Sequence, residues 1–226
     1  MHTQLSKQRA FQISEAYKTI RANLLFAISP FQNKAMLVAS AEPNAGKSIT
    51  SANIAITIAQ TGAKVLLIDA DMRNPSQHKI FRVNNNNGLS KIISGLSSFD
   101  SDSYYEEVSP SLDLITSGPT PPNPSELLVS ANMQALIDHV SSIYDYIIID
   151  TPPISVVADA LVLLSKIPPT LIIARQRQTN YDDLNQTIHA IKRLNGHLLG
   201  IVITDMQDIP KRKNVHYSHY YDSYFE

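Results

Sequence analysis

Six short apolar runs recur along the chain, with room for a helix between most of them. They lie at 35–40, 64–69, 113–116, 146–150, 170–174 and 198–204. Their residues are apolar in succession rather than in alternation, which is typical of strands that are buried on both faces. Strands of this kind that alternate with helices form a mostly parallel sheet covered on both sides. We therefore predict an α/β three-layer sandwich with helices on both faces of the sheet.

Hydrophobic residues at helical spacing fill the gaps between these runs. The predicted helices lie at 11–28, in the segment that closes at Gly62, and at about 88–94, 125–142, 156–165 and 180–194. A chain of 226 residues suits one large domain. We expect residues 1–209 to form that domain and residues 210–226 to form a flexible tail.

The composition excludes several classes of protein. A net charge of −1 gives no general attraction to nucleic acid. The chain has no cysteine, which excludes disulfides, thiolate zinc sites and cysteine-ligated iron–sulfur clusters. The most apolar region, 160–174, is interrupted by Lys166 and two prolines and is too short to cross a bilayer. We expect a cytoplasmic protein without a membrane anchor of its own and without a nucleic-acid partner.

The segment AEPNAGKS (41–48) joins the first apolar run to the next helix and follows the pattern G-x-x-x-x-G-K-[ST], with Ala41 in the first glycine's place. Backbone amides at the N-terminus of a helix bind phosphates. In such loops the lysine, here Lys47, reaches the β- and γ-phosphates, and the hydroxyl, here Ser48, binds Mg²⁺. Gly46 permits close approach of the backbone. An ordinary strand–helix turn is the alternative. The predicted nucleotide-binding residues are Pro43, Asn44, Ala45, Gly46, Lys47, Ser48 and Ile49.

Three acidic residues stand where predicted strands end. Asp150 closes the run at 146–150, and a carboxylate there is costly unless it faces a cation. Asp69 and Asp71 are two residues apart at the end of another run, so their repulsion calls for a cation or a proton. Arg73 could stabilise a transferring phosphoryl group or pair with a carboxylate. The alternatives are a helix cap or a turn aspartate for Asp150 and a solvated turn for the other two.

With these motifs, the chain resembles the bacterial tyrosine kinases that govern capsule and exopolysaccharide synthesis. AEPNAGKS (41–48), LLIDADMR (66–73) and IIIDTPP (147–153) are similar to their Walker A, Walker A′ and Walker B motifs. The resemblance extends to 15–24, 122–128, 200–204 and the tyrosine-rich C-terminus, so it covers nearly the whole chain. These kinases are similar in fold to the ParA/MinD-type P-loop ATPases.

The resemblance implies a protein-tyrosine autokinase that uses ATP and Mg²⁺. Lys47 and Ser48 would hold the phosphates of MgATP. Asp71 and Asp150, with Ser48, would organise the metal ion. Asp69 would be the base beside the acceptor hydroxyl. A phenol has a pKa of about 10, so the base would take its proton late, because phosphoryl transfer depends mainly on positioning and charge stabilisation.

The tyrosines near the C-terminus are the expected phosphoacceptors. They are Tyr217, Tyr220, Tyr221 and Tyr224. The thirteen residues from Thr204 to Tyr217 can span at most ~45 Å when extended, which suffices to reach the active site of a neighbouring subunit. The alternative is a tail whose tyrosines only pack on partner surfaces.

The resemblance also implies partners. Glu15, Lys18 and Arg21 occupy the family's E-x-x-R-x-x-R oligomer contact, with lysine in the first basic position. They imply a homo-oligomer of the family's octamer-like ring form. A solvated helix face with a Glu15–Lys18 pair is the alternative. The family further implies a separate membrane activator acting through its cytoplasmic segment, location at the inner membrane face through that activator, and a tyrosine phosphatase.

Two other functions remain open from the sequence. A ParA/MinD-type regulatory ATPase would carry a signature lysine early in the phosphate loop, where this chain has Ala41 and Glu42. A scaffold whose tail tyrosines are phosphorylated by another kinase would not need the acidic residues and Lys47 together. We favour the autokinase, acting in the regulation of capsule or exopolysaccharide synthesis and export.

Overall fold

The computed structural model describes residues 2–97, 105–154 and 159–205, which form a seven-stranded sheet in the order β3-β4-β2-β5-β1-β6-β7. The strands are β1 (Ala35–Ser40), β2 (Val65–Asp69), β3 (Glu106–Ser109), β4 (Leu112–Ile115), β5 (Tyr146–Asp150), β6 (Pro169–Arg175) and β7 (His197–Thr204). Every pairing is parallel except that of β3 with β4. The predicted parallel α/β sandwich is confirmed.

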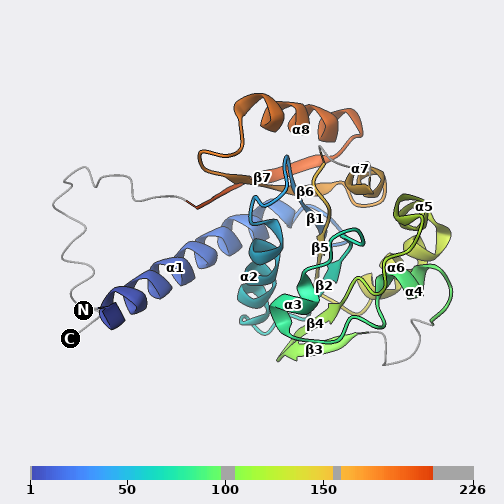
Figure 1. Ribbon diagram of the computed structural model, residues 1–226, viewed down its shortest axis with the longest axis horizontal. Coiled ribbons are helices and arrows are strands. Elements are labelled where there is room, and N and C mark those ends of the chain that lie inside the picture. Colours follow the sequence, from blue (N-terminus) through green and yellow to red (C-terminus); the bar gives the residue numbers. More distant parts are fainter. Residues whose placement is uncertain (1, 98–104, 155–158, 206–226) are drawn as a thin grey trace.

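Helices cover both faces of this sheet (Figure 1). They are α1 (His2–Ile28), α2 (Lys47–Ala59), α3 (Gln77–Phe81), α4 (Leu89–Ile93), α5 (Pro124–Val129), α6 (Ala131–Ser141), α7 (Asp159–Leu164) and α8 (Tyr181–Arg193). The hydrophobic core on one face includes residues of α1 and α2, and the core on the other includes residues of α4 to α8. In Figure 1 the first turns of α1 project beyond the rest of the sheet and helices.

The strands divide their side chains between the two cores because successive residues point to opposite faces. In β1, Met36 and Val38 pack with α1 and α2, whereas Leu37 and Ala39 pack with the helices of the other face. All are almost completely buried. This explains why the central strands read as continuous apolar runs instead of an alternation.

Some elements differ from the prediction. The helix expected at 125–142 is two helices, because Ser130 has extended backbone dihedrals that end α5, and its side chain accepts a hydrogen bond from the Met133 amide to cap α6. The strand expected at 113–116 begins one residue earlier. The sequence prediction missed β3 and α3. The sequence of β3, EEVS, is half exposed at the sheet edge and therefore has no apolar run.

The fold brings distant acidic residues to one edge of the sheet. Because β1, β2 and β5 are parallel neighbours, their carboxyl ends lie together. Asp69, at the end of β2, is in register with Asp150 at the end of β5. Asp150 is in turn in register with Val38, two residues before the end of β1. The loop after β1 therefore starts beside both carboxylates.

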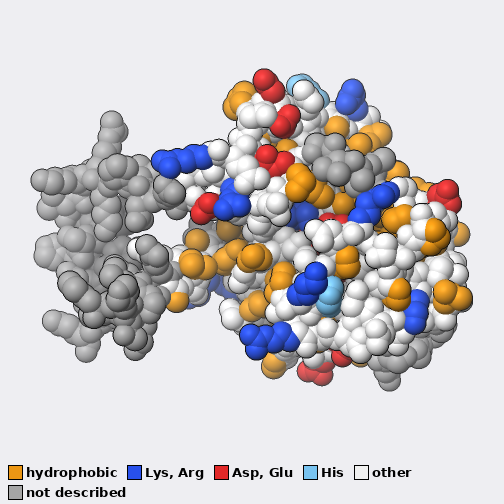
Figure 2. All heavy atoms as spheres, in the orientation of Figure 1, with side chains coloured by type: hydrophobic (Ala, Val, Ile, Leu, Met, Phe, Trp, Pro, Cys, Tyr) orange, Lys and Arg blue, Asp and Glu red, His pale blue; other side chains and the backbone are white. Residues whose placement is uncertain are grey.

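The surface shows no single-sign charged region among the described residues of the face in Figure 2, where basic and acidic side chains are interspersed. This agrees with the net charge of −1. Within the described part of the chain, none of the helices combines the length and the apolar character needed to span a bilayer.

The central strands should carry much of the stability. Ile148 of β5 is completely buried between β1 and β2, whereas Phe26 of α1 is 83% exposed. We expect Ile148→Ala to lower the free energy of unfolding by about 2–5 kcal/mol because it leaves a cavity. Phe26→Ala should change it by no more than about 0.5 kcal/mol. Denaturant unfolding of the two variants would test this, and equal losses would contradict it.

Candidate active site

A cavity of about 950 Å³ opens at the carboxyl edge of the sheet. Its walls come from the loop between β1 and α2, the segment after β2, and the ends of β6 and β7. This volume is at the upper end of the range for small-molecule sites. All the predicted nucleotide-binding residues line the cavity except Ala45, whose side chain is buried in the core. Ala45 can therefore contribute only its backbone.

The loop before α2 takes the shape that its glycine and asparagine allow. Gly46 has φ 85° and Asn44 has φ 61°, both in the left-handed region. The position of a Cβ on Gly46 would lie 3.5 Å from the Thr204 side chain. Ala41 is buried and does not have a positive φ. The alanine in the first glycine's place therefore causes no backbone strain in this loop.

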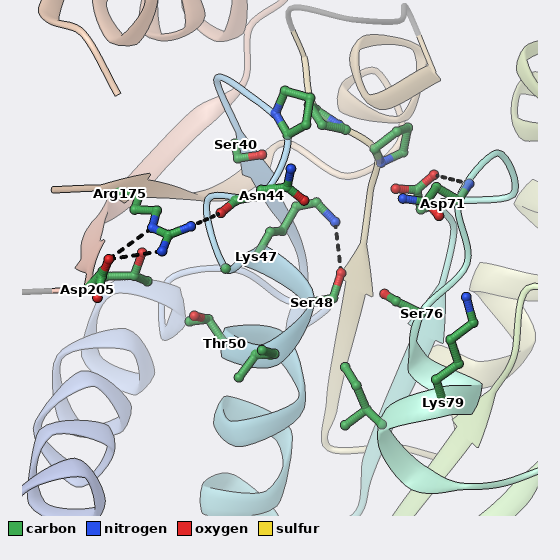
Figure 3. A pocket seen from close by; sticks show the side chains of 18 of the residues that line it. Ser40, Asn44, Lys47, Ser48, Thr50, Asp71, Ser76, Lys79, Arg175 and Asp205 are labelled. Carbon is green, nitrogen blue, oxygen red and sulfur yellow. Dashed lines mark hydrogen bonds and ion pairs between the residues drawn. The ribbon is translucent and has the colours of Figure 1, made fainter. Parts of the chain in front are cut away.

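Side chains from the last two strands and the turn after β6 hold the carbonyl groups of this loop. Thr204 Oγ1 donates to the Ala45 carbonyl at 2.7 Å. Arg175 Nη1 donates to the Asn44 carbonyl at 3.2 Å (Figure 3). Gln178 Nε2 donates to the carbonyl of Pro43 at 3.1 Å.

In a planar trans peptide the C=O and the following N–H point in opposite directions. The amides of residues 44–46 therefore point away from the carbonyl partners, as phosphate binding requires. Sequence reasoning missed Arg175 and Gln178. The only available signal was their position at and just after the carboxyl end of a predicted strand.

A buried ion pair joins this loop to β5. Lys47 Nζ lies 2.5 Å from Asp150 Oδ1, and it is also 3.4 Å from Ser48 Oγ. Asp150 is completely buried and Lys47 is 7% exposed. The second carboxylate oxygen of Asp150 accepts a hydrogen bond from Gln77 Nε2 at 2.7 Å. Lys47 is therefore the cation beside Asp150 in this structure, and metal binding by Asp150 stays a prediction.

The two aspartates after β2 have different surroundings. Asp69 is completely buried and does not line the cavity; its oxygens accept hydrogen bonds from the amides of Asp71, Ser76 and Gln77. Burial, and then the charge of Asp150, raises the pKa of Asp69 to about 7.

Asp71 lines the cavity and accepts a hydrogen bond from the Asn74 amide at 3.0 Å. Burial raises the pKa of Asp71, and the Lys47 charge opposes that rise. Arg73 also lines the cavity, with Nη2 3.4 Å from Ser125 Oγ. In Figure 3, Asp71, Ser76 and Lys79 lie across the cavity from Lys47 and Ser48.

The residues present fit Mg²⁺ brought in by nucleotide phosphates. Ser48, Asp71 and Asp150 offer oxygen donors, which this ion prefers. Among the described residues, no group of three or more histidine, cysteine, aspartate or glutamate side chains could hold a metal alone. Mg²⁺ commonly takes one or two carboxylates and completes its shell with phosphates and water. Ser48 and Asp71 line the cavity, whereas Asp150 lies behind Lys47.

The expected oligomer contact on α1 makes contacts within the chain. Lys18 Nζ pairs with Glu15 at 2.7 Å, as the solvated-face interpretation predicts. Arg21 Nη1 donates to the Thr57 carbonyl of α2 at 2.8 Å. An oligomer through these residues stays a prediction. The tail and the four acceptor tyrosines lie outside the described residues.

Comparison with known proteins gives consistent matches. Residues 32–224 match the ParA family described as the NUBPL iron-transfer P-loop NTPase. The putative tyrosine-protein kinase CapB of Staphylococcus aureus is 40% identical over 92% of this chain and 90% of its own length. The tyrosine-protein kinase etk of Escherichia coli (strain K12) is 32% identical over 91% of this chain, but the match covers 28% of etk.

Solved structures agree with these sequence matches. The kinase domain of E. coli etk superposes with a TM-score of 0.80 at 32% identity, covering 86% of this chain and 78% of that one. The chimerical protein CapA2B2 gives a TM-score of 0.80 at 35% identity, with 86% and 85% covered. The NUBPL description names iron transfer, and this chain has no cysteine to ligate an iron–sulfur cluster.

The raised pKa of Asp69 should make stability depend on pH. Between about pH 4 and 7 the folded chain holds a proton that the unfolded chain releases, so unfolding becomes easier as pH rises through this window. One such group contributes a slope of up to about 1.4 kcal/mol per pH unit. Asp69→Asn should remove this part of the slope.

Denaturant unfolding without nucleotide, repeated across the window, measures the slope. Asp138→Asn on α6 is the control, because its side chain is exposed and does not line the cavity. An Asp69→Asn chain with the parent's slope would contradict the assignment.

Proposed function

Since the chain belongs to the bacterial tyrosine kinases, within the ParA-like P-loop NTPases, we propose that it transfers the γ-phosphoryl group of MgATP to tyrosines of its own C-terminus. The proposed acceptors are Tyr217, Tyr220, Tyr221 and Tyr224. One observation carries the proposal: a single cavity joins the phosphate loop, with Lys47 and Ser48, to Asp71 and Arg73. The buried Asp150 forms an ion pair with Lys47 from beneath the cavity wall.

The proposed reaction is an in-line displacement at the γ-phosphorus. The phenol oxygen forms a bond to phosphorus, the bond to the β–γ bridging oxygen breaks, and ADP leaves. Bound Mg²⁺ would neutralise charge on the phosphate oxygens. The amides of the phosphate loop and Lys47 hold the phosphates, and Arg73 is placed on the cavity wall to stabilise the transferring group.

Asp69 is the proposed acceptor of the phenol proton. A pKa of about 7 suits a group that takes a proton near neutral pH. Its oxygens are occupied by the amides of Asp71, Ser76 and Gln77. We therefore expect the segment between Asp69 and Gln77 to open when the acceptor tyrosine enters.

The place where β7 ends supports transfer to tyrosines of the tail. Thr204 and Asp205 line the cavity, so the tail leaves the domain at the rim of the proposed active site. The thirteen residues to Tyr217 reach at most ~45 Å. A second subunit in a homo-oligomer, assembled through Glu15, Lys18 and Arg21, would lie within that reach.

The proposed partners follow from the family. The longer relative etk is matched over 28% of its length, so this chain corresponds to one part of that protein. We propose that a separate membrane protein activates this chain through a cytoplasmic segment and holds it at the inner membrane face. A tyrosine phosphatase would reverse the reaction. The proposed role is the regulation of capsule or exopolysaccharide synthesis and export.

Incubation with MgATP and mapping of the modified residues tests the proposal. We expect phosphate on tyrosines within 217–224 and at least a hundredfold loss in Lys47→Met, because this change removes the cation beside the phosphates and the partner of Asp150. The measurement is mass spectrometry of the tail, with and without the cytoplasmic segment of the activator.

A mixture of Lys47→Met with a chain truncated after residue 209 separates the routes of transfer. Phosphate on the tail of the Lys47→Met chain would show transfer between subunits. Release of inorganic phosphate with unmodified tyrosines would leave a regulatory ATPase, and tail modification only by an added kinase would leave a scaffold.

A further inference from the structure

Gln77 forms hydrogen bonds to the two parts of the site that we expect to bind Mg²⁺. It is the first residue of α3 and its side chain is completely buried. Nε2 donates to Asp150 Oδ2 at 2.7 Å and to the backbone carbonyl of Ser48 at 3.0 Å. Both partners are acceptors, so the amide nitrogen, with its two hydrogens, must face them. The Gln77 side chain therefore connects α2, the helix that follows the phosphate loop, to the end of β5.

From this geometry we propose that Gln77 is a positioning residue that fixes Asp150 relative to Ser48, and so sets the site for the Mg²⁺ of MgATP. This inference rests on the proposed function. Ser48 and Asp150 belong to different elements, α2 and β5, and Gln77 forms a hydrogen bond to each of them. Without Gln77, the Asp150 carboxylate would keep Lys47 as its close partner but would lose the contact that fixes its second oxygen.

The chemistry of an amide suits this position. Asp150 already has one cation beside it, Lys47 at 2.5 Å. A second cation would give this ion pair a net positive charge and repel Mg²⁺, whereas a neutral donor orients the carboxylate and adds no charge. Partners that orient metal-binding side chains commonly contribute 10–100-fold to metal affinity.

The backbone of Gln77 adds a second link. Its amide donates to Asp69 Oδ2 at 2.9 Å, so one residue contacts both buried carboxylates that are paired in register across β2 and β5. A side-chain substitution leaves this backbone bond available. The effect of Gln77 on Asp150 can therefore be tested separately from its effect on Asp69.

The remaining polar atom of Gln77 is an acceptor with no donor. Oε1 is buried and has no hydrogen-bond partner among the described residues. A buried polar atom without a partner is destabilising. Gln77 does not line the cavity, so a donor for this oxygen would have to be a water held inside the protein. The proposal rests on the two hydrogen bonds of Nε2.

Gln77→Met tests the proposal, because methionine has a similar length and no hydrogen-bond donor. We expect the Mg²⁺ concentration that half-saturates tight binding of a fluorescent ATP analogue to rise at least tenfold. Binding of the same analogue without Mg²⁺ should change less than twofold. The control is Gln186→Met, the same change at an exposed position of α8, which should match the parent in both measurements.

Kinetics give a second readout. At saturating Mg²⁺ we expect the kcat for tail phosphorylation of Gln77→Met to fall at least tenfold, with less than a threefold change in KM for ATP. A Gln77→Met chain that is only less stable, with the parent's Mg²⁺ dependence and kcat, would overturn the proposal.

If Gln77→Met does not fold, Gln77→Asn replaces it. Asparagine keeps the amide but is one carbon shorter and cannot span both acceptors. We therefore expect the same tenfold rise in the Mg²⁺ concentration required. An unchanged Mg²⁺ requirement would overturn the proposal. Failure of the proposed function is distinguishable: the parent would bind the analogue with Mg²⁺ and leave its tyrosines unmodified, while the Mg²⁺ comparison between parent and variant would still hold.

Discussion

The buried ion pair between Lys47 and Asp150 is the interaction on which the rest of the site depends. Each charge would be costly to bury alone, and each comes from a different part of the chain, the start of α2 and the end of β5. The pair forms because parallel strands place their carboxyl ends at one edge, where the register sets Asp150 beside both β1 and β2. Removal of either partner would leave an uncompensated charge at the base of the cavity.

The surroundings of this pair divide the acidic residues by role. Asp71 faces the cavity, Asp150 is held behind Lys47, and Asp69 is enclosed by loop amides with its pKa raised to about 7. Three carboxylates close in space would repel one another, and each is kept in place by a different set of donors. A site built this way is suited to bind a highly charged nucleotide and a metal ion.

Much of this arrangement could be predicted because its signals are local in sequence. The glycine–lysine–serine loop and the acidic residues at strand ends can be recognised from the sequence. Parallel strands must bring them to one edge of the sheet. The contacts of Arg175, Gln178 and Gln77 could not be predicted, because they join segments from 29 to 135 positions apart and depend on the final packing. The strand β3 has no apolar run in the sequence because it is a half-exposed edge strand. Whether Lys18 pairs with Glu15 or contacts a neighbouring subunit could be decided only from geometry.

The bracing of the phosphate loop by Thr204 and Arg175 has a consequence for how the chain is made. The loop at 41–48 leaves the ribosome early, but the hydrogen bonds that hold its carbonyl groups come from the ends of β6 and β7, which are translated more than a hundred residues later. A nascent chain that already carries β1, β2 and β5 therefore still has an unbraced loop. Competence to hold a nucleotide is thus acquired near the close of translation, when β6 pairs with β1 and β7 pairs with β6.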